Sequence, residues 1–338
     1  MSLILGIETS CDETGIALVE DGRRVIAETL LSQVDIHRVF GGVVPEIASR
    51  KHIEVIYQLT RDTLAQAGLD MASGRQQIDA VAATRGPGLM GSLLVGMGFA
   101  RSLAWAWRKP FVPVHHIEGH LYAAFLGERV PQFPFLALIV SGGHTQLVYC
   151  PEPLRYELLG TTRDDAVGEC FDKVARLLGL PYPGGPSIQK AAQTGNPDAC
   201  HFPRAMRDSD TLDFSYSGLK TAVLYMLRDH PDLPVPDVAA SFQRAAVDML
   251  LERTEQAIAR TGCERLVVAG GVAANALLRE SVQQLGVEVY LPAFRWCLDN
   301  GAMIACAAHY RLQAGCADHT LSASADPSLD LICSGQAG

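Results

Sequence analysis

The chain has 338 residues, 48% of them hydrophobic and 19% charged, so it can bury a large core and is not a disordered segment. This length corresponds to about two domains of ordinary size. The net charge of −9 excludes nucleic-acid binding by bulk attraction alone, because neutralising phosphates requires clustered Lys and Arg. Any nucleic-acid partner must therefore be held by a local basic patch or by a second protein.

The cysteine pattern and the N-terminal segment indicate the compartment. Nine cysteines are widely spaced without a CxxC pair, which argues against both a disulfide framework and a zinc knuckle. Residues 1–8 lack the basic start of a signal peptide, and no run of about 18 uncharged apolar residues suggests a membrane span. We expect a cytoplasmic protein with no membrane contact.

The first half of the chain reads as a β-meander followed by alternating helices and strands. Strands are expected at residues 3–7, 14–19, 25–30, 78–83 and 111–114. Helices are expected from Pro45 to about residue 64, from after Gly88 to about residue 107, and from about His116 onward. Proline at the first position of a helix is favourable, which supports the start at Pro45.

The second half repeats this order of elements. Strands are expected at 135–140, 145–150, 156–159, 265–269 and 287–291, and helices at 166–178, 217–228, 238–260, 275–284 and 300–312. Three strands followed by α/β crossovers give a mixed sheet covered by helices on both faces. We predict an α/β fold of two βββαβαβα lobes with a nucleotide cleft between them, the layout of the actin, sugar kinase and Hsp70 superfamily.

The predicted domains follow from this repeat. The first lobe spans 1–132, the second spans 133–314 with a helical insert at about 180–235, and a C-terminal tail spans 315–338.

A histidine pair is the clearest candidate for metal binding. His116 and His120 are four residues apart, which places both imidazoles on one face of a helix, although exposed or capping histidines are an alternative interpretation. Asp299 precedes a predicted helix, where it could be the third ligand or an N-cap. Two imidazoles and one carboxylate would leave open positions on Fe(II) or Zn(II). In HExxH proteases the glutamate directly follows the first histidine, whereas Ile117 stands there in this chain and Glu118 projects from another face.

Glycine clusters are candidates for phosphate binding. The turn at 141–144 joins two predicted strands, and Gly142 and Gly143 could adopt positive φ and form an anion-binding nest, although an ordinary hairpin turn is the alternative. The equivalent turn of the first lobe carries Asp12, which could serve a metal or act as a base. Residues 268–275 end a strand and open a helix, whose N-terminus can meet a phosphate or ribose.

Ten ordered motifs resemble those of the bacterial-type tRNA N6-adenosine threonylcarbamoyltransferase family, formerly called O-sialoglycoprotein endopeptidases or glycoproteases. They are residues 6–14, 41–46, 86–89, 115–120, 140–145, 171–173, 182–186, 214–221, 270–275 and 299–303. The resemblance runs from residue 3 to about 312. Cys170 departs from the smaller residue expected there, and the tail after Ala314 matches no motif.

The resemblance implies a set of ligand-binding residues. One divalent metal per chain, usually Fe²⁺ with Zn²⁺ as the alternative, is held by His116, His120 and Asp299. An adenine nucleotide, either ATP/ADP or threonylcarbamoyl-AMP, is bound by Ile139, Val140, Ser141, Gly142, Gly143, Asp172, Gly185 and Asn275. Asp12 is the candidate catalytic base.

The resemblance also implies the reaction and the partners. The family transfers a threonylcarbamoyl group from threonylcarbamoyl-AMP to the N6 amine of the adenosine beside the anticodon in ANN-decoding tRNAs, releasing AMP. The expected partners are tRNA, a paralogous dimerisation protein, a small ATPase and a separate synthase that supplies threonylcarbamoyl-AMP. The alternatives are a metalloprotease, and a non-catalytic ATP-binding regulatory module that has no need of the three metal ligands together.

Overall fold

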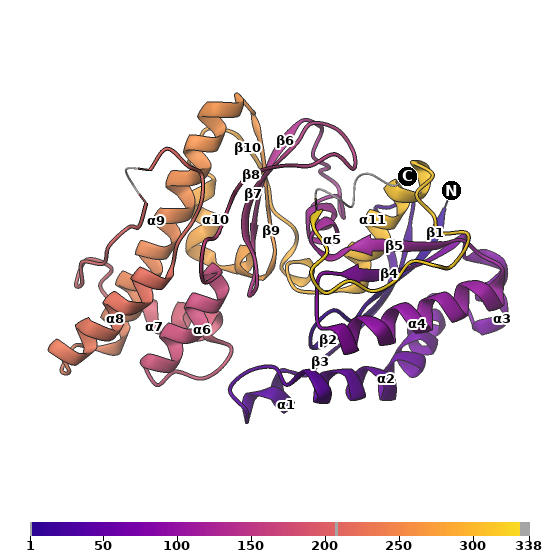
Figure 1. Ribbon diagram of the computed structural model, residues 1–338, viewed down its shortest axis with the longest axis horizontal. Helices are drawn as coiled ribbons and strands as arrows, with labels where there is room; N and C mark the ends of the chain where they lie inside the picture. The colour runs from indigo at the N-terminus through magenta and orange to yellow at the C-terminus, as the bar shows by residue number, and fades with distance from the viewer. Residues whose placement is uncertain (1, 207–208, 332–338) are drawn as a thin grey trace. The chain divides into compact units, whose positions relative to one another are not determined.

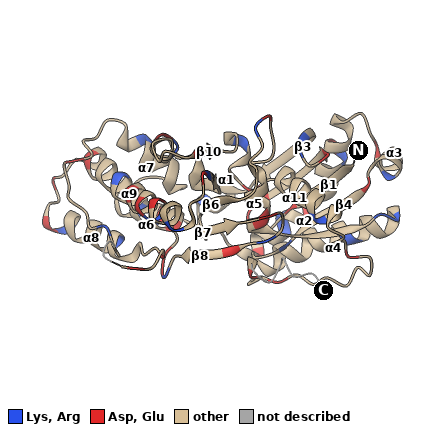
Figure 2. Ribbon diagram, turned by 90° about the horizontal axis from the view of Figure 1, so that it is seen from above, with Lys and Arg blue, Asp and Glu red and all other residues tan. Residues whose placement is uncertain are grey.

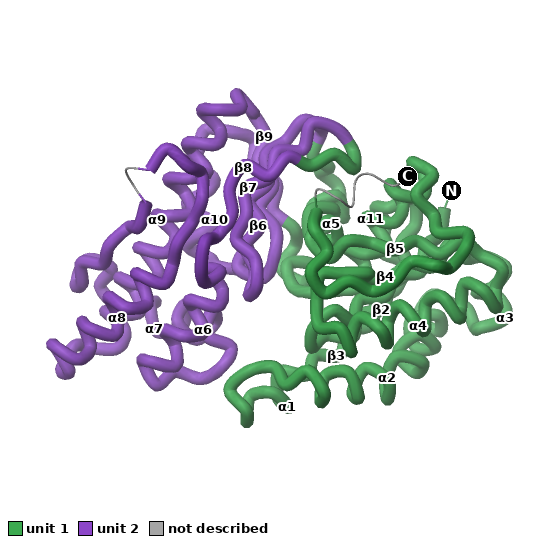
Figure 3. The backbone as a smooth tube through the Cα atoms, viewed as in Figure 1, with its two compact units in different colours: residues 1–131, 153–156, 292–338 green, residues 132–152, 157–291 purple. Residues whose placement is uncertain are grey.

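The computed structural model describes residues 2–206 and 209–331, and the chain divides into two compact units (Figures 1 and 3). Unit 1 comprises residues 1–131, 153–156 and 292–338, and unit 2 comprises 132–152 and 157–291. The first boundary lies beside the predicted one at 132. The chain returns to unit 1 at residue 292, however, so the last part of the predicted second lobe is packed with the first.

The sheet of unit 1 has the order β3-β2-β1-β4-β5. Its strands are β1 (Leu3–Glu8), β2 (Glu13–Glu20), β3 (Arg24–Ser32), β4 (Ala80–Gly86) and β5 (Phe111–His115). β2 is antiparallel to β1 and β3, whereas β4 runs parallel to both β1 and β5. The almost continuous burial of the central strands β1 and β4, and of the edge strand β5, is typical of strands covered on both faces.

Helices cover both faces of this sheet, with α2 and α4 on one face and α11 on the other. The helices that precede or follow its strands are α1 (Val34–Arg38), α2 (Pro45–Gln66), α3 (Met71–Gln77), α4 (Met90–Trp107), α5 (His116–Ala123) and α11 (Gly301–Gln313). Leu5 and Ile7 of β1 belong to one apolar core with residues of α2 and α4. Gly6 points to the opposite face, where α11 lies, because successive residues of a strand alternate between faces.

The sheet of unit 2 repeats the topology of unit 1, with the order β10-β9-β6-β7-β8. Its strands are β6 (Phe135–Val140), β7 (Thr145–Cys150), β8 (Glu157–Thr161), β9 (Arg265–Ala269) and β10 (Glu288–Tyr290). β7 is antiparallel to β6 and β8, and β9 is parallel to β6 and β10. The predicted duplication of three strands followed by α/β crossovers is therefore confirmed.

The helices of unit 2 are α6 (Val167–Leu177), α7 (Gly184–Ala192), α8 (Ser217–Asp229), α9 (Val235–Thr261) and α10 (Ala276–Val282). Every predicted helix and strand is present, and the predicted bounds lie within about three residues of the observed ones. The prediction missed α1, α3, α7 and the short 3-10 turns η1 (Gly271–Ala274) and η2 (Phe294–Trp296). The insert at 180–235 contains α7 and α8, separated by a long irregular segment.

The described part of the C-terminal tail packs on unit 1. Its backbone oxygens at Leu321 and Ala323 accept hydrogen bonds from the Arg101 side chain, and Ser324 O accepts one from Arg85 Nε at 2.9 Å. The last seven residues of the predicted tail, 332–338, lie outside the described residues. All cysteines in the described ranges are free thiols, and no helix there is long and apolar enough to cross a membrane.

Three glycines allow α11 to lie directly on β1 and β2. A Cβ added to Gly6 would lie 2.3 Å from the Gly301 carbonyl oxygen and 2.5 Å from the Ala305 nitrogen. A Cβ added to Gly15 would lie 2.6 Å from the Gly301 nitrogen. Only hydrogen side chains at these positions permit such backbone contact. α11, from a distant part of the sequence, therefore packs directly on the strands of unit 1, which explains why the chain returns to this unit.

We predict that Gly6→Ala lowers the free energy of unfolding by about 1–3 kcal/mol, because the added methyl group must displace backbone atoms of α11. Thermal and denaturant unfolding measure this change. Gly218→Ala is the matched control, since a Cβ there meets no atom within 4 Å and alanine favours the helix. Equal stability of Gly6→Ala and the wild type would contradict the close packing of α11.

Candidate active site

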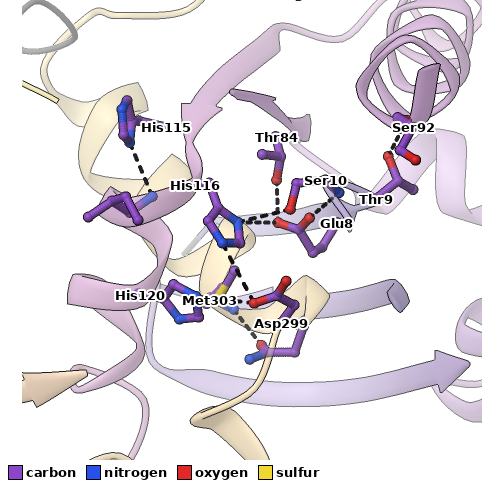
Figure 4. Close-up of polar contacts among 12 residues, drawn as sticks. Glu8, Thr9, Ser10, Thr84, Ser92, His115, His116, His120, Asp299 and Met303 are labelled. Atoms are coloured by element: carbon purple, nitrogen blue, oxygen red, sulfur yellow. Dashed lines mark hydrogen bonds and ion pairs between the residues drawn. The ribbon is translucent and has the colours of Figure 1, made fainter. Parts of the chain in front are cut away.

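Three potential metal ligands of unit 1 lie together. His116 and His120 are one helical turn apart on α5, and Asp299 stands two residues before α11. Asp299 Oδ1 lies 3.1 Å from His120 Nε2 and 3.6 Å from His116 Nε2 (Figure 4). One ligand atom from each residue lies within 4.8 Å of the others. The structure thus gathers the three residues that the sequence analysis proposes as ligands.

The alternative roles of these residues do not agree with the geometry. Both imidazoles are buried, with residue exposures of 8% for His116 and 1% for His120. The histidine that caps α5 is His115, whose Nδ1 accepts a hydrogen bond of 3.1 Å from the Ile117 nitrogen. The N-cap of α11 is Asn300, whose Oδ1 accepts from the Met303 nitrogen at 2.8 Å. Capping therefore leaves His116, His120 and Asp299 available for a ligand.

His120 is the best test of whether the group suits a metal. Within the described residues, neither of its ring nitrogens makes a hydrogen bond, although Asp299 lies 3.1 Å away. A buried polar atom without a hydrogen bond is costly unless another partner satisfies it. Imidazole nitrogen and carboxylate oxygen are ligands that suit Zn²⁺ and Fe²⁺. The donor set and its burial therefore fit one divalent cation.

A fourth residue, Glu8, orients His116 from behind. Glu8 Oε2 lies 3.2 Å from His116 Nδ1, and the carboxylate also accepts from Thr84 Oγ1 at 2.5 Å and from the Ser10 nitrogen. With a proton on Nδ1 directed at Glu8, the lone pair of Nε2 faces Asp299. Such a carboxylate behind a metal-binding imidazole fixes its tautomer and raises its basicity. The sequence analysis did not assign this role to Glu8; the signal was a carboxylate at the end of an apolar strand, which is fully buried.

The electrostatics of the group favour a positive charge at its centre. Burial lowers the pKa of His116, but the carboxylates of Asp299 and Glu8 outweigh it and raise that pKa to about 9. The position between these carboxylates therefore attracts either a proton or a metal cation. Because two imidazoles and a carboxylate can all coordinate one divalent metal, this position favours the metal over a proton when the metal is available.

Two more carboxylates follow β1: Asp12 in the turn of residues 9–12, and Glu13 at the start of β2. Asp12, the candidate base, is buried there. Burial, then the charges of Asp299 and Asp12, raise the pKa of Glu13 to about 9. Asp12, Glu13 and Asp299 are thus close enough to repel one another, and a bound divalent cation would reduce this repulsion. The sequence analysis proposed a metal-binding or base role for Asp12 in this turn.

The candidate nucleotide-binding residues of unit 2 lie at the carboxyl edge of its parallel strands. β6 ends at Val140 and β9 ends at Ala269, side by side in the sheet. Gly168 N donates to Ser141 O at 3.2 Å, which places the start of α6 against the β6–β7 turn. Gly184 N donates to Asp172 Oδ1 at 2.7 Å, which joins α7 to α6. Ligands of α/β sheets bind beyond this edge.

Asn275 joins the same region through its neighbours. Its Oδ1 accepts from the Leu278 nitrogen at 3.1 Å and so caps α10, and its Nδ2 donates to Gln243 Oε1 at 2.9 Å. η1, directly before it, packs on β6, β9 and α6. The side chain of Asn275 is therefore engaged in holding α10 and α9 together. The edge itself gathers the segments that carry Ile139 to Gly143, Asp172, Gly185 and Asn275.

The predicted phosphate nest at the β6–β7 turn is wrong in its backbone geometry. Neither Gly142 nor Gly143 has a positive φ. The turn is closed instead by Ser141, whose nitrogen donates to His144 O at 2.8 Å and whose Oγ accepts from the His144 nitrogen at 3.1 Å. Both glycines are exposed, and a Cβ added to either meets no atom within 4 Å. Their small size leaves open space above the turn rather than relieving strain.

Gly270 is required for a different reason, which is its backbone conformation. Its φ is +94°, and an added Cβ would lie 2.4 Å from Val140 O. Only glycine combines this backbone conformation with contact to the end of β6. Gly270 therefore holds the β9–η1 turn against the edge that carries the candidate nucleotide-binding residues.

Comparison with solved structures defines the class of fold. Full-length HypF in its phosphate- and nucleotide-bound form matches 93% of this chain and 56% of its own length, with a TM-score of 0.61 and 14% identity. Component A of the (R)-2-hydroxyglutaryl-CoA dehydratase of Acidaminococcus fermentans matches 93% of this chain and 100% of its own, with a TM-score of 0.55 and 15% identity. At these identities the likeness shows the fold alone, which is consistent with the predicted layout of the actin, sugar kinase and Hsp70 superfamily.

Sequence comparison then gives the family. The profile described as "TsaD: tRNA N6-adenosine threonylcarbamoyltransferase" matches residues 24–306. Proteins of that name from Symbiobacterium thermophilum and a Polaromonas species are 51% and 53% identical to the chain; the first alignment covers 97% of both sequences, and the second covers 93% of this chain and 92% of its relative. The chain belongs to the tRNA N6-adenosine threonylcarbamoyltransferase family.

We predict that His120→Ala loses most of the bound metal while the fold survives, because the substitution removes one ligand and leaves only a small cavity. Elemental analysis after reconstitution with Fe²⁺ or Zn²⁺ measures the metal, and circular dichroism checks the fold. His319→Ala, at an exposed histidine of the tail, is the control. One metal per chain in the His120→Ala protein would refute the assignment.

We predict that Gly142→Val abolishes the rise in melting temperature that ATP, ADP or AMP causes, because the side chain would fill the open space above the β6–β7 turn. The stability without nucleotide should change little, since no protein atom is close. Differential scanning fluorimetry measures both quantities. A nucleotide response equal to that of the wild type would place the phosphate elsewhere.

Proposed function

We propose that this chain transfers the threonylcarbamoyl group from threonylcarbamoyl-AMP to the N6 amine of the adenosine adjacent to the anticodon in ANN-decoding tRNAs. The buried group of His116, His120 and Asp299, in a chain that belongs to this family, is the observation that carries the proposal. The acceptor is an amine rather than water, and AMP is the leaving group, so the reaction is an acyl transfer and not a hydrolysis.

In this reaction the N6 nitrogen attacks the carbamoyl carbon, and the bond from that carbon to the phosphate oxygen breaks. A divalent metal bound by His116, His120 and Asp299, Fe²⁺ in our proposal, supplies Lewis-acid stabilisation of oxygen and a template for the substrate. Asp12 accepts the proton that the amine loses. Glu8 holds the Nδ1 proton of His116 throughout.

We propose that the adenylate binds at the carboxyl edge of the unit 2 sheet. Backbone N–H groups at Gly142 and Gly143 donate to the phosphate and stabilise the charge of departing AMP. Asp172, Gly185 and Asn275 line the nucleoside side of the same site, with Ile139 and Val140 as its floor. The two glycines are exposed and have open space above them, which supports this placement.

Peptide hydrolysis agrees less well with the side chains of α5. Glu118 would have to activate a metal-bound water, yet it is fully buried and its carboxylate is paired with Arg311 at 2.9 Å. A regulatory module without catalysis would have no need of a buried, oriented ligand set. Both alternatives are therefore disfavoured.

We propose that tRNA is held with the help of protein partners. The net charge is −9, and Figure 2 shows Lys and Arg interspersed with Asp and Glu along both units in that view. α2 and α4 carry exposed large apolar side chains: Ile53, Tyr57, Leu94 and Trp105, the last 75% exposed. α2 and α4 pack against each other, and exposed apolar side chains on neighbouring helices are candidates for protein contacts. We propose these helices as the docking face for the paralogous dimerisation protein, with the small ATPase and the separate synthase completing the pathway.

We predict that Asp299→Ala reduces transfer by several orders of magnitude, because it removes a metal ligand and with it the template role of the metal. The assay follows labelled threonine into tRNA with the partners and the synthase present. Asp326→Ala, at a carboxylate of the C-terminal tail, is the control and should retain activity.

A casein or glycoprotein digest run beside this assay separates the alternatives. Proteolysis that depends on His116 and His120, without label in tRNA, would replace the proposed transferase with a protease. Full transfer by Asp299→Ala would remove the metal site from the mechanism.

A further inference from the structure

α5 presents a buried carboxylate between its two metal-binding histidines. Glu118 follows His116 by two residues, about 200° around the helix, so it points away from the metal group. Its exposure is 0%, and its Oε2 lies 2.9 Å from Nη1 of Arg311 on α11, itself 7% exposed. The proposed mechanism has no step for either residue.

The ligands themselves come from the same two helices. His116 and His120 are on α5, and Asp299 immediately precedes Asn300, the cap of α11. The distance from Asp299 to the imidazoles therefore depends on how α5 sits against α11. α5 has only eight residues, and a rotation about its axis by one residue, about 100°, would turn both imidazoles away from Asp299.

Apolar contacts set the distance between the two helices. A Cβ added to Gly119 would lie 2.8 Å from Ile304 Cδ1 and 3.2 Å from Met303 Cγ, so the helices approach closely at this glycine. The rings of Tyr122 and Tyr310 stack with centroids 4.6 Å apart. The aliphatic contacts at Gly119 are non-directional and by themselves permit small rotations. The ion pair is directional and is the charged link between α5 and α11 that the described residues show.

Stability alone does not explain a buried pair of this kind. Desolvating two charges offsets most of their attraction, and apolar replacements are often as stable or more stable. We propose that Glu118 and Arg311 are positioning residues whose ion pair fixes the rotation of α5 against α11 and thereby holds His116 and His120 at coordinating distance from Asp299. This inference rests on the metal site of the proposed function.

Three variants of the full chain test it: Glu118→Gln, Arg311→Met, and the double variant Glu118→Leu with Arg311→Met. The probe is Co²⁺, whose affinity is measured by competition with a chelator and whose visible absorption bands report the ligand geometry. Melting temperatures of the metal-free proteins report stability. We expect both single variants to bind Co²⁺ about 10–100-fold more weakly than the wild type, with altered bands, as for residues that orient metal ligands.

The double variant separates positioning from stability. It should regain the metal-free melting temperature of the wild type or exceed it, but its Co²⁺ affinity should stay low. Arg204→Met is the control, because it breaks a part-buried ion pair of unit 2, with Asp248 at 2.7 Å, and should leave Co²⁺ binding unchanged. Wild-type Co²⁺ affinity in Glu118→Gln or in the double variant would overturn the inference. If the wild type itself binds no Co²⁺, the metal site fails and the inference falls with it.

Discussion

The backbone contact of α11 with β1 and β2 is the constraint on which the candidate metal site depends. Gly6, Gly15 and Gly301 let the first turn of α11 rest on the strands without intervening side chains. Asp299 stands just before that turn, and Glu8 ends the strand beneath it. The same packing that completes the core of unit 1 therefore delivers one ligand and the carboxylate that orients another. A shift of α11 would alter the core and the site together.

The surroundings of the site extend this dependence to the C-terminal tail. His115 caps α5 with Nδ1, and its Nε2 lies 3.0 Å from Leu329 O in the tail. A proton on Nε2 directed at that carbonyl leaves Nδ1 free to accept from Ile117, so the tail favours the tautomer that capping requires. The first turn of α5 is thus supported by a segment more than 200 residues away in the chain. Sequence motifs alone gave no role to this tail.

Most elements of the fold follow from local patterns, and the exceptions have physical reasons. Burial-driven runs such as 135–140 predict strands well, whereas α7 begins at Gly184 without a capping side chain and gives no local signal. α3 did carry a signal, since Asp70 and Ser73 form a capping box. The return of residues 292–338 to unit 1 is a tertiary choice, made by glycines on β1 and β2 that look ordinary in the sequence.

The candidate site, like the fold, has a part that local sequence predicts and a part that depends on tertiary contacts. The spacing of His116 and His120 predicts a shared helical face, but no spacing identifies Asp299 or Glu8, which depend on contacts between distant segments. Gly142 and Gly143 were expected to adopt positive φ, but neither does, because Ser141 closes their turn through its hydroxyl; their lack of side chains keeps the space above the turn open. From the sequence, a glycine pair in a turn can mean either a positive φ or a need for open space, and the structure shows the second.

The duplicated topology gives equivalent turns opposite chemistry. The turn after β1 in unit 1 carries Ser10 and Asp12 and leads into Glu13 of β2, whereas the turn after β6 in unit 2 carries Ser141, Gly142 and Gly143. Carboxylates repel a phosphate and attract a cation, and bare amides do the reverse. Once one copy of the repeat has acidic side chains at this edge and the other has none, the first can host a metal and the second an anion. An enzyme that activates an acyl phosphate ester needs both, and two copies of one fold supply them without a change of topology.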